Sequence, residues 1–328
     1  MLNKFYLNNI QKLQENISKF GEKIIILEKI IDIVNSKNDI NKYKVYIEQV
    51  NFKIKYFKDI VKINKEYLNF INNYISDNKN SSLNKKALII GINYNANPSF
   101  KLDGCVEDAY RIKDFLINNY NLNEEDIIFM TDDSKNINPN KENILYYLNK
   151  FTSESNPKDK LFFYFSGHGE KFIDLNNDEK DNYDEKLVTS DIKFISDDSI
   201  FKIFKRLNKD AKLFCLMDLC FSASIGDLQY TYYSLENPLN NDNKLDKNIH
   251  MISGSKDNQY SFNALIKDEY RGLLTMAFLE YIKEENILKK LISKIRKYME
   301  VNNIPQFPVI SSSKLINEND KFIFDNED

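Results

Sequence analysis

Residues 161–169 read LFFYFSGHG, and residues 213–220 follow the same plan with LFCLMDLC. In each stretch a continuous apolar run stops at polar and chemically reactive side chains. Runs that are apolar at every position are typical of strands buried on both faces of a parallel sheet. Because active sites in such sheets lie beyond the carboxyl ends of the strands, His168 and Cys220 are expected to meet at one sheet edge.

Short apolar runs alternate with helical stretches from Lys85 onward. The pattern predicts strands at 87–92, 127–131, 161–165, 211–218, 249–253 and 321–324, and helices at 106–118, 141–151, 198–207, 274–283 and 287–298. Alternation of this kind indicates an α/β fold in which helices cover both faces of a mainly parallel sheet.

Residues 1–80 have a different period. Their apolar residues recur at alternating spacings of three and four, with a polar break at 35–39. This predicts two helices in an antiparallel hairpin, an N-terminal arm that precedes a domain at 81–328. A coiled-coil arm for self-association or partner docking has the same pattern and stays open. The polar segment 76–84 is the expected linker.

The composition excludes several classes of function. The 328 residues carry 46 Lys and Arg against 49 Asp and Glu, a net charge of −3, so no basic face indicates nucleic-acid binding. No apolar run approaches the roughly 18 residues that span a bilayer, and the first residues lack the features of a signal peptide. We therefore expect a cytoplasmic protein without a membrane partner. The three cysteines have neither zinc-site nor disulfide-framework spacing.

His168 and Cys220 form a candidate nucleophile and base. An imidazole beside a thiol can deprotonate it and return the proton to a leaving amine. The Gly169 and Cys220 amides are candidate donors of an oxyanion hole. Each residue taken singly also has a structural interpretation, but their separation of 52 residues matches the spacing of about 50 in caspase-like proteases. Cys215 and His250 are interpreted as structural.

Several segments carry a specific resemblance. They are KKALIIGINY, GCVEDA, FFYFSGHG, DEKDNYDEKLVTSD, ISDDS, DLCFSAS, MISGSKDNQYS, GLLTMAFLEYI and QFPVISSS. In this order, over residues 85–324, they resemble the signatures of metacaspases, caspase-like cysteine peptidases of family C14. The resemblance implies a caspase-like three-layer fold, a His168–Cys220 dyad, and calcium-stimulated cleavage of proteins or peptides after Lys or Arg. It also implies a large-subunit-like part at 85–227 and a small-subunit-like part at 249–328.

The resemblance implies a substrate pocket as well. By motif, Asp108 and Asp218 line the pocket for the residue before the cut, with Ser166 and Cys105 beside them. Two carboxylates favour a Lys or Arg side chain and repel the Asp that caspases prefer. The alternative is that Asp108 supports its helix N-terminus and Asp218 accepts a backbone hydrogen bond.

Calcium is the cofactor that the resemblance implies. The positions that resemble the family's ligands are Asp184, Asp197, Asp198 and Asp227, and carboxylate oxygens suit this ion. An EF-hand interpretation of Asp174, Asn176, Asp178 and Glu185 is weaker, because Glu179 stands where the loop needs glycine. A solvated acidic loop without an ion is the remaining alternative.

Residues 228–248 join the two parts. We expect an exposed loop there, with Lys244 or Lys247 as a self-processing site. Its shortness resembles type I metacaspases. The chain departs from the family at Phe221 and Ala223, beside the nucleophile. A catalytically silent scaffold that signals through the helical arm is the rival to an active peptidase.

Overall fold

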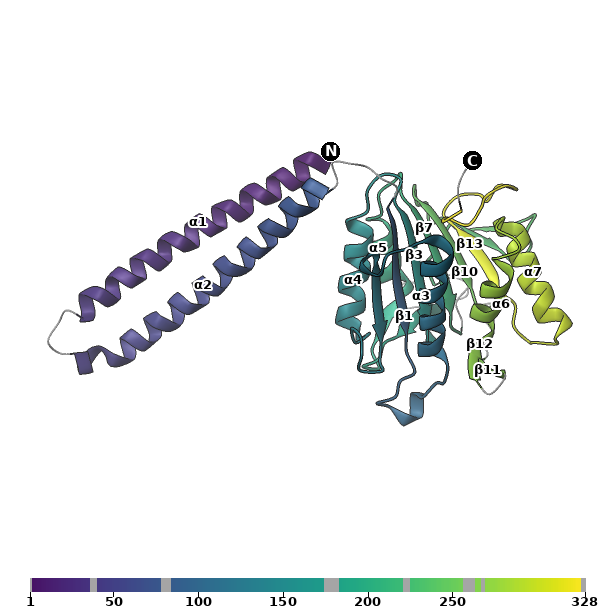
Figure 1. Ribbon diagram of the computed structural model, residues 1–328, viewed down its shortest axis with the longest axis horizontal. Coiled ribbons are helices and arrows are strands. Elements are labelled where there is room, and N and C mark those ends of the chain that lie inside the picture. Colours follow the sequence, from purple (N-terminus) through teal and green to yellow (C-terminus); the bar gives the residue numbers. More distant parts are fainter. Residues whose placement is uncertain are drawn as a thin grey trace. The chain divides into compact units, whose positions relative to one another are not determined.

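The computed structural model describes residues 2–35, 40–77, 84–173, 183–220, 225–255, 263–266 and 269–325. The chain divides into two compact units, Met1–Ser82 and Leu83–Asp328. Figure 1 shows two helices in the first unit and a sheet covered by helices in the second.

The first unit is a helical hairpin. Helices α1 (Leu2–Asn35) and α2 (Ile40–Asp77) lie side by side (Figure 1). Ile24 on α1 is buried against Val50 and Ile54 on α2, and Glu28 pairs with Lys58 at 2.8 Å. The hairpin expected from the period of the sequence is confirmed. None of the helices in the described ranges is both long and apolar enough to cross a membrane.

The second unit is built around one large sheet. In the described residues its strands run in the order β2-β1-β3-β7-β10-β13-β8-β9. Their bounds are β1 Lys85–Gly91, β2 Ile127–Thr131, β3 Lys160–Ser166, β7 Lys212–Asp218, β8 Tyr230–Tyr232, β9 Leu239–Asn240, β10 Asn248–Ser253 and β13 Val309–Ser312. The first five strands in the spatial order are parallel, and the last three pair antiparallel. The expected mainly parallel sheet is therefore confirmed.

Helices cover both faces of this sheet. One face carries α3 (Cys105–Tyr120), α6 (Leu273–Tyr281) and α7 (Leu288–Val301), and the other carries α4 (Lys141–Ser153) and α5 (Asp197–Phe204). Alternate residues of β3 serve the two cores. Phe162 and Tyr164 pack in the first, and Leu161, Phe163 and Phe165 pack in the second. This explains why the strand is apolar at every position.

Smaller elements surround the sheet edges. Two short helices are η1 (Pro98–Phe100) and η2 (Glu124–Asp126). A three-stranded sheet contains β4 (Gly169–Ile173), β5 (Tyr183–Val188) and β6 (Phe194–Ser196). A two-stranded sheet contains β11 (Asn263–Ile266) and β12 (Glu269–Gly272). The expected helix and strand set contained none of these. Each is short and partly polar, so no clear period separates it from a loop.

The strand expected at 321–324 is wrong. Lys321 makes only an isolated bridge to Ile287, and the last strand is β13 instead. Phe322 and Phe324 are nonetheless buried, and the Phe322 ring lies 5.0 Å from that of Phe214. The apolar run at the chain end fills the core as a turn, which periodicity over four residues cannot distinguish from a strand.

The segment 228–248 is also more ordered than expected. It contains β8 and β9, and β8 extends the main sheet by pairing with β13. Tyr232 is buried there, and its hydroxyl accepts a hydrogen bond from the Ile316 amide at 2.8 Å. Only the part after β9 remains as a connecting loop.

Candidate active site

The two reactive residues lie at the same sheet edge. Strands β3 and β7 are parallel neighbours in which Ser166 stands opposite Asp218, so His168 and Cys220 each follow two residues later. A Cβ added to Gly169 would collide with the carbonyl oxygen of Cys220, so the two backbone segments touch. Both reactive residues are half-buried. The meeting predicted from the strand ends is thus present at the level of the backbone.

The imidazole of His168 is oriented by neighbours from another loop. Its Nε2 lies 2.7 Å from the carbonyl oxygen of Phe100, and its ring centroid lies 4.7 Å from that of Tyr94. A carbonyl oxygen only accepts, so Nε2 carries the proton in this arrangement and Nδ1 keeps its lone pair. The ring is thereby held in the tautomer that can act as a base through Nδ1.

Tyr94 fixes the loop that carries His168. The Tyr94 hydroxyl accepts a hydrogen bond from the His168 amide and donates one to the Val188 carbonyl, both at 2.8 Å. Burial raises the pKa of Tyr94 well above its usual value, which keeps the hydroxyl as a donor. Sequence reasoning did not assign Tyr94 or Phe100 a role. The only signal was the position of Tyr94 at the end of KKALIIGINY, just past β1.

The Gly169 amide points away from its ladder. The Val188 amide donates to the His168 carbonyl at 3.1 Å, so residues 168 and 188 stand at a hydrogen-bonding position of the ladder, although the His168 amide donates to Tyr94. Hydrogen-bonded and non-hydrogen-bonded pairs alternate along antiparallel strands. Gly169, paired with Leu187, therefore turns its N–H to the other side. A donor that the ladder does not use is what an oxyanion site requires.

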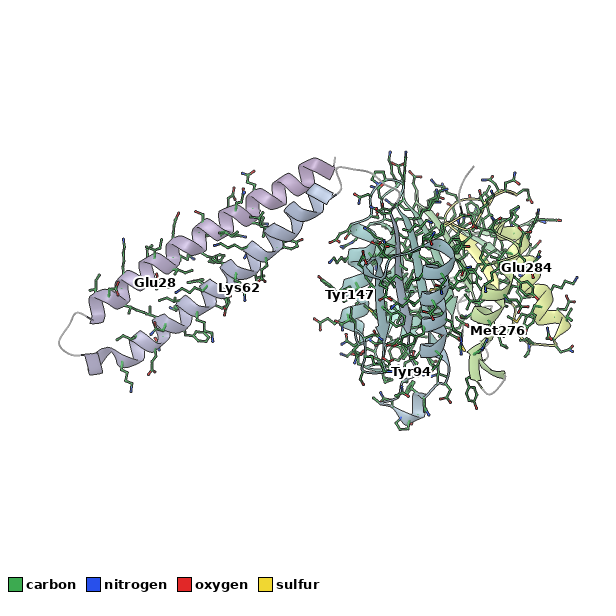
Figure 2. All side chains as sticks on the ribbon, in the orientation of Figure 1. Glu28, Lys62, Tyr94, Tyr147, Met276 and Glu284 are labelled. Atoms are coloured by element: carbon green, nitrogen blue, oxygen red, sulfur yellow. The ribbon has the colours of Figure 1, made fainter. Side chains whose placement is uncertain are left out.

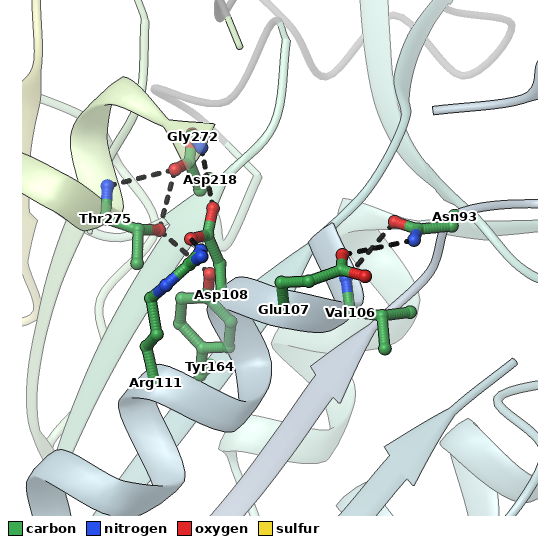
Figure 3. A network of polar contacts seen from close by, with 9 residues as sticks. All are labelled: Asn93, Val106, Glu107, Asp108, Arg111, Tyr164, Asp218, Gly272 and Thr275. Atoms are coloured by element: carbon green, nitrogen blue, oxygen red, sulfur yellow. Dashed lines mark hydrogen bonds and ion pairs between the residues drawn. The ribbon is translucent and has the colours of Figure 1, made fainter. Parts of the chain in front are cut away.

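Two buried carboxylates form an acidic pair near this edge (Figure 3). Asp108, in the first turn of α3, accepts hydrogen bonds from Arg111 at 2.7 Å and from the Gly272 amide at 2.6 Å. Asp218, at the end of β7, accepts from the amide and hydroxyl of Thr275 at 3.0 and 2.7 Å. A Cβ on Gly272 would collide with Asp218 and lie 3.1 Å from Asp108, so this position brings both carboxylates together.

Burial makes the acidic pair sensitive to charge. Asp108 is 1% and Asp218 5% exposed. The pKa of Asp108 is raised to about 7, chiefly by burial and also by the charge of Asp218, while the Gly272 amide and Arg111 act in the opposite direction. A cation that reaches the pair stabilises the ionised form of Asp108. The sequence predicted the carboxylates but missed Gly272 and Thr275, which lie more than fifty residues away along the chain.

A cavity of about 250 Å³ lies beside the first turn of α3. Its lining contains Arg111 and Tyr270 together with the acidic side chains of Asp103 and Glu107. Glu107 accepts a hydrogen bond from Asn93 at 3.3 Å (Figure 3). Arg111, which binds Asp108, connects this cavity to the acidic pair.

The other two expected pocket residues lie near the same edge. Ser166 ends β3 and Cys105 begins α3, and both are 2% exposed. A Cβ on Gly91, at the end of β1, would meet the Cys105 carbonyl at 2.5 Å. Cys215 is fully buried in the core, where burial raises its pKa, as its structural interpretation predicts.

The candidate calcium ligands lie in and around β5 and α5. Asp197 is buried and accepts hydrogen bonds from the amides of Glu185 and Asp198 at 2.8 and 2.7 Å, whereas Asp198 pairs with Lys202 at 2.8 Å. Asp227 is buried with φ of 47°. Asp184 lies on β5, and its side chain falls outside the described residues. In the described part of the chain, no three His, Cys, Asp or Glu side chains converge as a metal site.

The EF-hand alternative lacks its helical frame. Asp174, Asn176 and Asp178 lie outside the described residues, but the segment is entered by β4 and left by β5. Glu185 on β5 is buried and pairs with Lys171 at 3.3 Å. An EF-hand requires helices on both sides of its loop, so the strands argue against it.

Comparisons with known proteins agree with this geometry. The model of the metacaspase peptidase C14 domain matches residues 85–229. Metacaspase-1B of Aspergillus niger is 30% identical over 297 residues, covering 74% of this chain and 67% of that protein. The chain belongs to the metacaspase family. Another metacaspase, Metacaspase-1A of Neurospora crassa, is 30% identical over 301 residues, covering 74% of this chain and 66% of that protein.

A shorter match has a higher identity. Metacaspase-1 of Cryptococcus neoformans is 41% identical over 154 residues, covering 45% of this chain and 34% of that protein. A crystal structure of a protein from Geobacter sulfurreducens has a TM-score of 0.52 at 19% identity, covering 73% of this chain and 97% of that one, which supports the fold alone. Overall this metacaspase spans about two thirds of the length of the first two relatives.

Proposed function

We propose that this metacaspase is an active cysteine endopeptidase that cleaves proteins or peptides after Lys or Arg. The observation that carries the proposal is the acidic pair at the same sheet edge as His168 and Cys220. Asp108 and Asp218 supply negative charge where the side chain of the residue before the cut would enter, and Cys220 follows Asp218 by two residues.

The proposed reaction uses groups that the fold already orients. His168 Nδ1 takes the proton of the Cys220 thiol, and the thiolate attacks the carbonyl carbon of the scissile bond. The Gly169 and Cys220 amides stabilise the resulting oxyanion, each worth about 3 kcal/mol. His168 then gives its proton to the leaving amine, and water hydrolyses the thioester.

The test is a panel of fluorogenic peptides that differ only in the residue before the cut. Peptides ending in Arg or Lys should be cleaved and the matched Asp peptide should not, because the acidic pair repels a third carboxylate. The assays are run with and without millimolar calcium. Absence of turnover on every peptide in both conditions would contradict the proposal and favour the silent scaffold.

The affinity for basic peptides should depend on pH. Burial raises the pKa of Asp108 to about 7 in the unbound protein, so protonation below that value removes negative charge from the pocket. Binding of an Arg peptide to the inactive Cys220→Ala variant, measured by calorimetry, should weaken as pH falls below about 7, by up to about tenfold per unit. The Asp108→Asn variant should bind more weakly and show a flat profile. A wild-type slope in Asp108→Asn would exclude Asp108 as the titrating group.

We further propose that calcium binds beside α5 and activates the enzyme. The buried carboxylates of Asp197 and Asp227 have the oxygen chemistry that calcium prefers, and Asp184 and Asp198 complete the proposed set. When bound, the ion would supply positive charge that holds these carboxylates, and hence the surrounding loops, in one arrangement.

Calcium should therefore stabilise the protein. At about ten times its dissociation constant it should add about 1.4 kcal/mol and raise Tm by a few degrees. Asp227→Asn should lose this shift, whereas Asp114→Asn, which removes an exposed carboxylate on α3, should retain it. Differential scanning fluorimetry with magnesium as the control ion measures both. An equal calcium shift in Asp227→Asn would contradict the site.

Self-processing is proposed at Lys244 or Lys247. Lys244 is exposed in the loop after β9, and Lys247 is half-buried with its carbonyl bonded to the Ser313 hydroxyl at 2.9 Å. Lys244 is the more accessible of the two lysines. Because the next residue, Leu245, is buried, the loop must open locally before the bond after Lys244 can be cleaved. Intact-mass analysis should show a cut after Lys244 that Lys244→Gln removes. A cut that persists in a Lys244→Gln/Lys247→Gln double variant would place self-processing elsewhere.

A further inference from the structure

Helix α2 carries two apolar seams, one packed against α1 and one largely exposed. The covered seam contains Val50 and Ile54 together with the partly buried Phe57 and Val61. The second seam, here called the outer seam, consists of Phe52, Tyr56, Ile63 and Tyr67, whose exposed fractions are 73%, 56%, 63% and 53%. At about 100° per residue these four lie within roughly 60° of each other, and their mean direction is roughly 140° from that of the covered seam.

A continuous outer seam is unusual for a helix that needs one partner. The four side chains extend along α2 for about 22 Å, at a rise of about 1.5 Å per residue. Single exposed apolar residues are common on protein surfaces, but a stripe of large ones marks an interaction site. Helices with two seams are typical of bundles of three or more helices.

Charged side chains beside the outer seam indicate what covers it. Lys55, Asp59, Lys62 and Glu66 are all exposed along one flank, and their signs alternate. Figure 2 shows α2 with its side chains and labels Lys62. If a second α2 lies antiparallel across a twofold axis, Lys55 can stand opposite Glu66, and Asp59 opposite Lys62. Each ion pair then occurs twice, so the flank is complementary to itself.

The same register interleaves the apolar residues. Tyr56 falls at a level between Ile63 and Tyr67 of the second copy, and Tyr67 falls between Phe52 and Tyr56. Side chains that enter the spaces between partner residues give the packing seen in antiparallel helix pairs. One register therefore satisfies both the charges and the seam.

We propose that two copies of this chain associate through the outer seams of their arms. The two α2 helices pair antiparallel, and with the two α1 helices they form a four-helix bundle. The occupant of the seam is thus a second copy of this chain. The inference does not depend on peptidase activity, since none of its residues lies in the peptidase unit.

The full-length chain tests the proposal by sedimentation velocity and light scattering. At about 50 µM the mass should be twice the chain mass of 38.8 kDa. Ile63→Asp should give a monomer with unchanged helicity by circular dichroism. The matched control Ile25→Asp, equally exposed at 54% but on α1 and off the seam, should remain a dimer. A monomeric wild type, or a dimeric Ile63→Asp, would overturn the proposal.

A charge swap tests the register without altering the seam. Lys62→Glu should weaken dimerisation about tenfold, because it faces Asp59 of the second copy. Adding Asp59→Lys to the same chain exchanges the signs and should restore the dissociation constant to within about threefold. If the double variant is as weak as Lys62→Glu alone, the antiparallel pairing is wrong.

Discussion

Replacing Cys220 with alanine is expected to lower the rate of cleavage after arginine by at least about 10³-fold. Cys220 lies at the same sheet edge as His168. Of the three cysteines, all of which lie in described residues, it is the only one that is not buried. Among the other described side chains near that edge, only Cys105 carries a thiol, and it is buried. The measurement is kcat/KM on an Arg peptide, with intact mass to follow self-processing.

Cys215→Ala is the matched control. Its thiol is fully buried in β7, and burial raises its pKa, so it forms no thiolate. We expect kcat/KM within about twofold of the wild type and a loss of about 1 kcal/mol in the free energy of unfolding. Activity retained in Cys220→Ala and lost in Cys215→Ala would reverse the assignment of the nucleophile.

Replacing Asp218 with asparagine should lower kcat/KM for Arg and Lys peptides by about 10²-fold to 10³-fold. Asparagine keeps the shape, and its amide oxygen can still accept from Thr275, which holds Asp218 now. The substitution removes a buried negative charge opposite the substrate cation. Removing one partner of such a buried charge pair costs several kcal/mol of binding free energy. KM should therefore rise and the intact protein should remain folded.

Kinetic measurements supply both the control for Asp218→Asn and the result that would contradict its role. Asp114→Asn removes the same unit of charge from the exposed side of α3 and should leave kcat/KM within about twofold. A peptide with a neutral residue before the cut should be cleaved equally by Asp218→Asn and the wild type. If Asp218→Asn lowers turnover of both peptides alike, Asp218 supports the fold and does not set specificity.

The main sheet, and the shared edge at which the segments of His168 and Cys220 end, could be predicted because both depend on periodicity. Strands apolar at every position, such as β3 and β7, must be buried on both faces, and parallel strands bring their carboxyl ends to one edge. The helical hairpin followed from the same kind of reasoning. The strand expected at 321–324 failed because the three apolar residues Phe322, Ile323 and Phe324 bury equally well in a turn.

Contacts between distant segments could not be predicted. The ring of His168 is oriented by Phe100 and Tyr94, and Asp108 by the amide of Gly272, 164 residues further along. Such partners are chosen by the three-dimensional path of the backbone, and their residue types carry no pattern. The outer seam was not predicted either, because the exposure of its residues is known only from the structure.

The most direct test of the central claim is covalent labelling. A peptidyl acyloxymethyl ketone with Arg at its end is added to the protein, and the modified residue is identified by peptide mass spectrometry, with an Asp probe as control. We predict a thioether on Cys220 from the Arg probe, lost in His168→Ala and Asp218→Asn, and none from the Asp probe. Labelling of Cys105 or Cys215 instead, or equal labelling by both probes, would contradict the account.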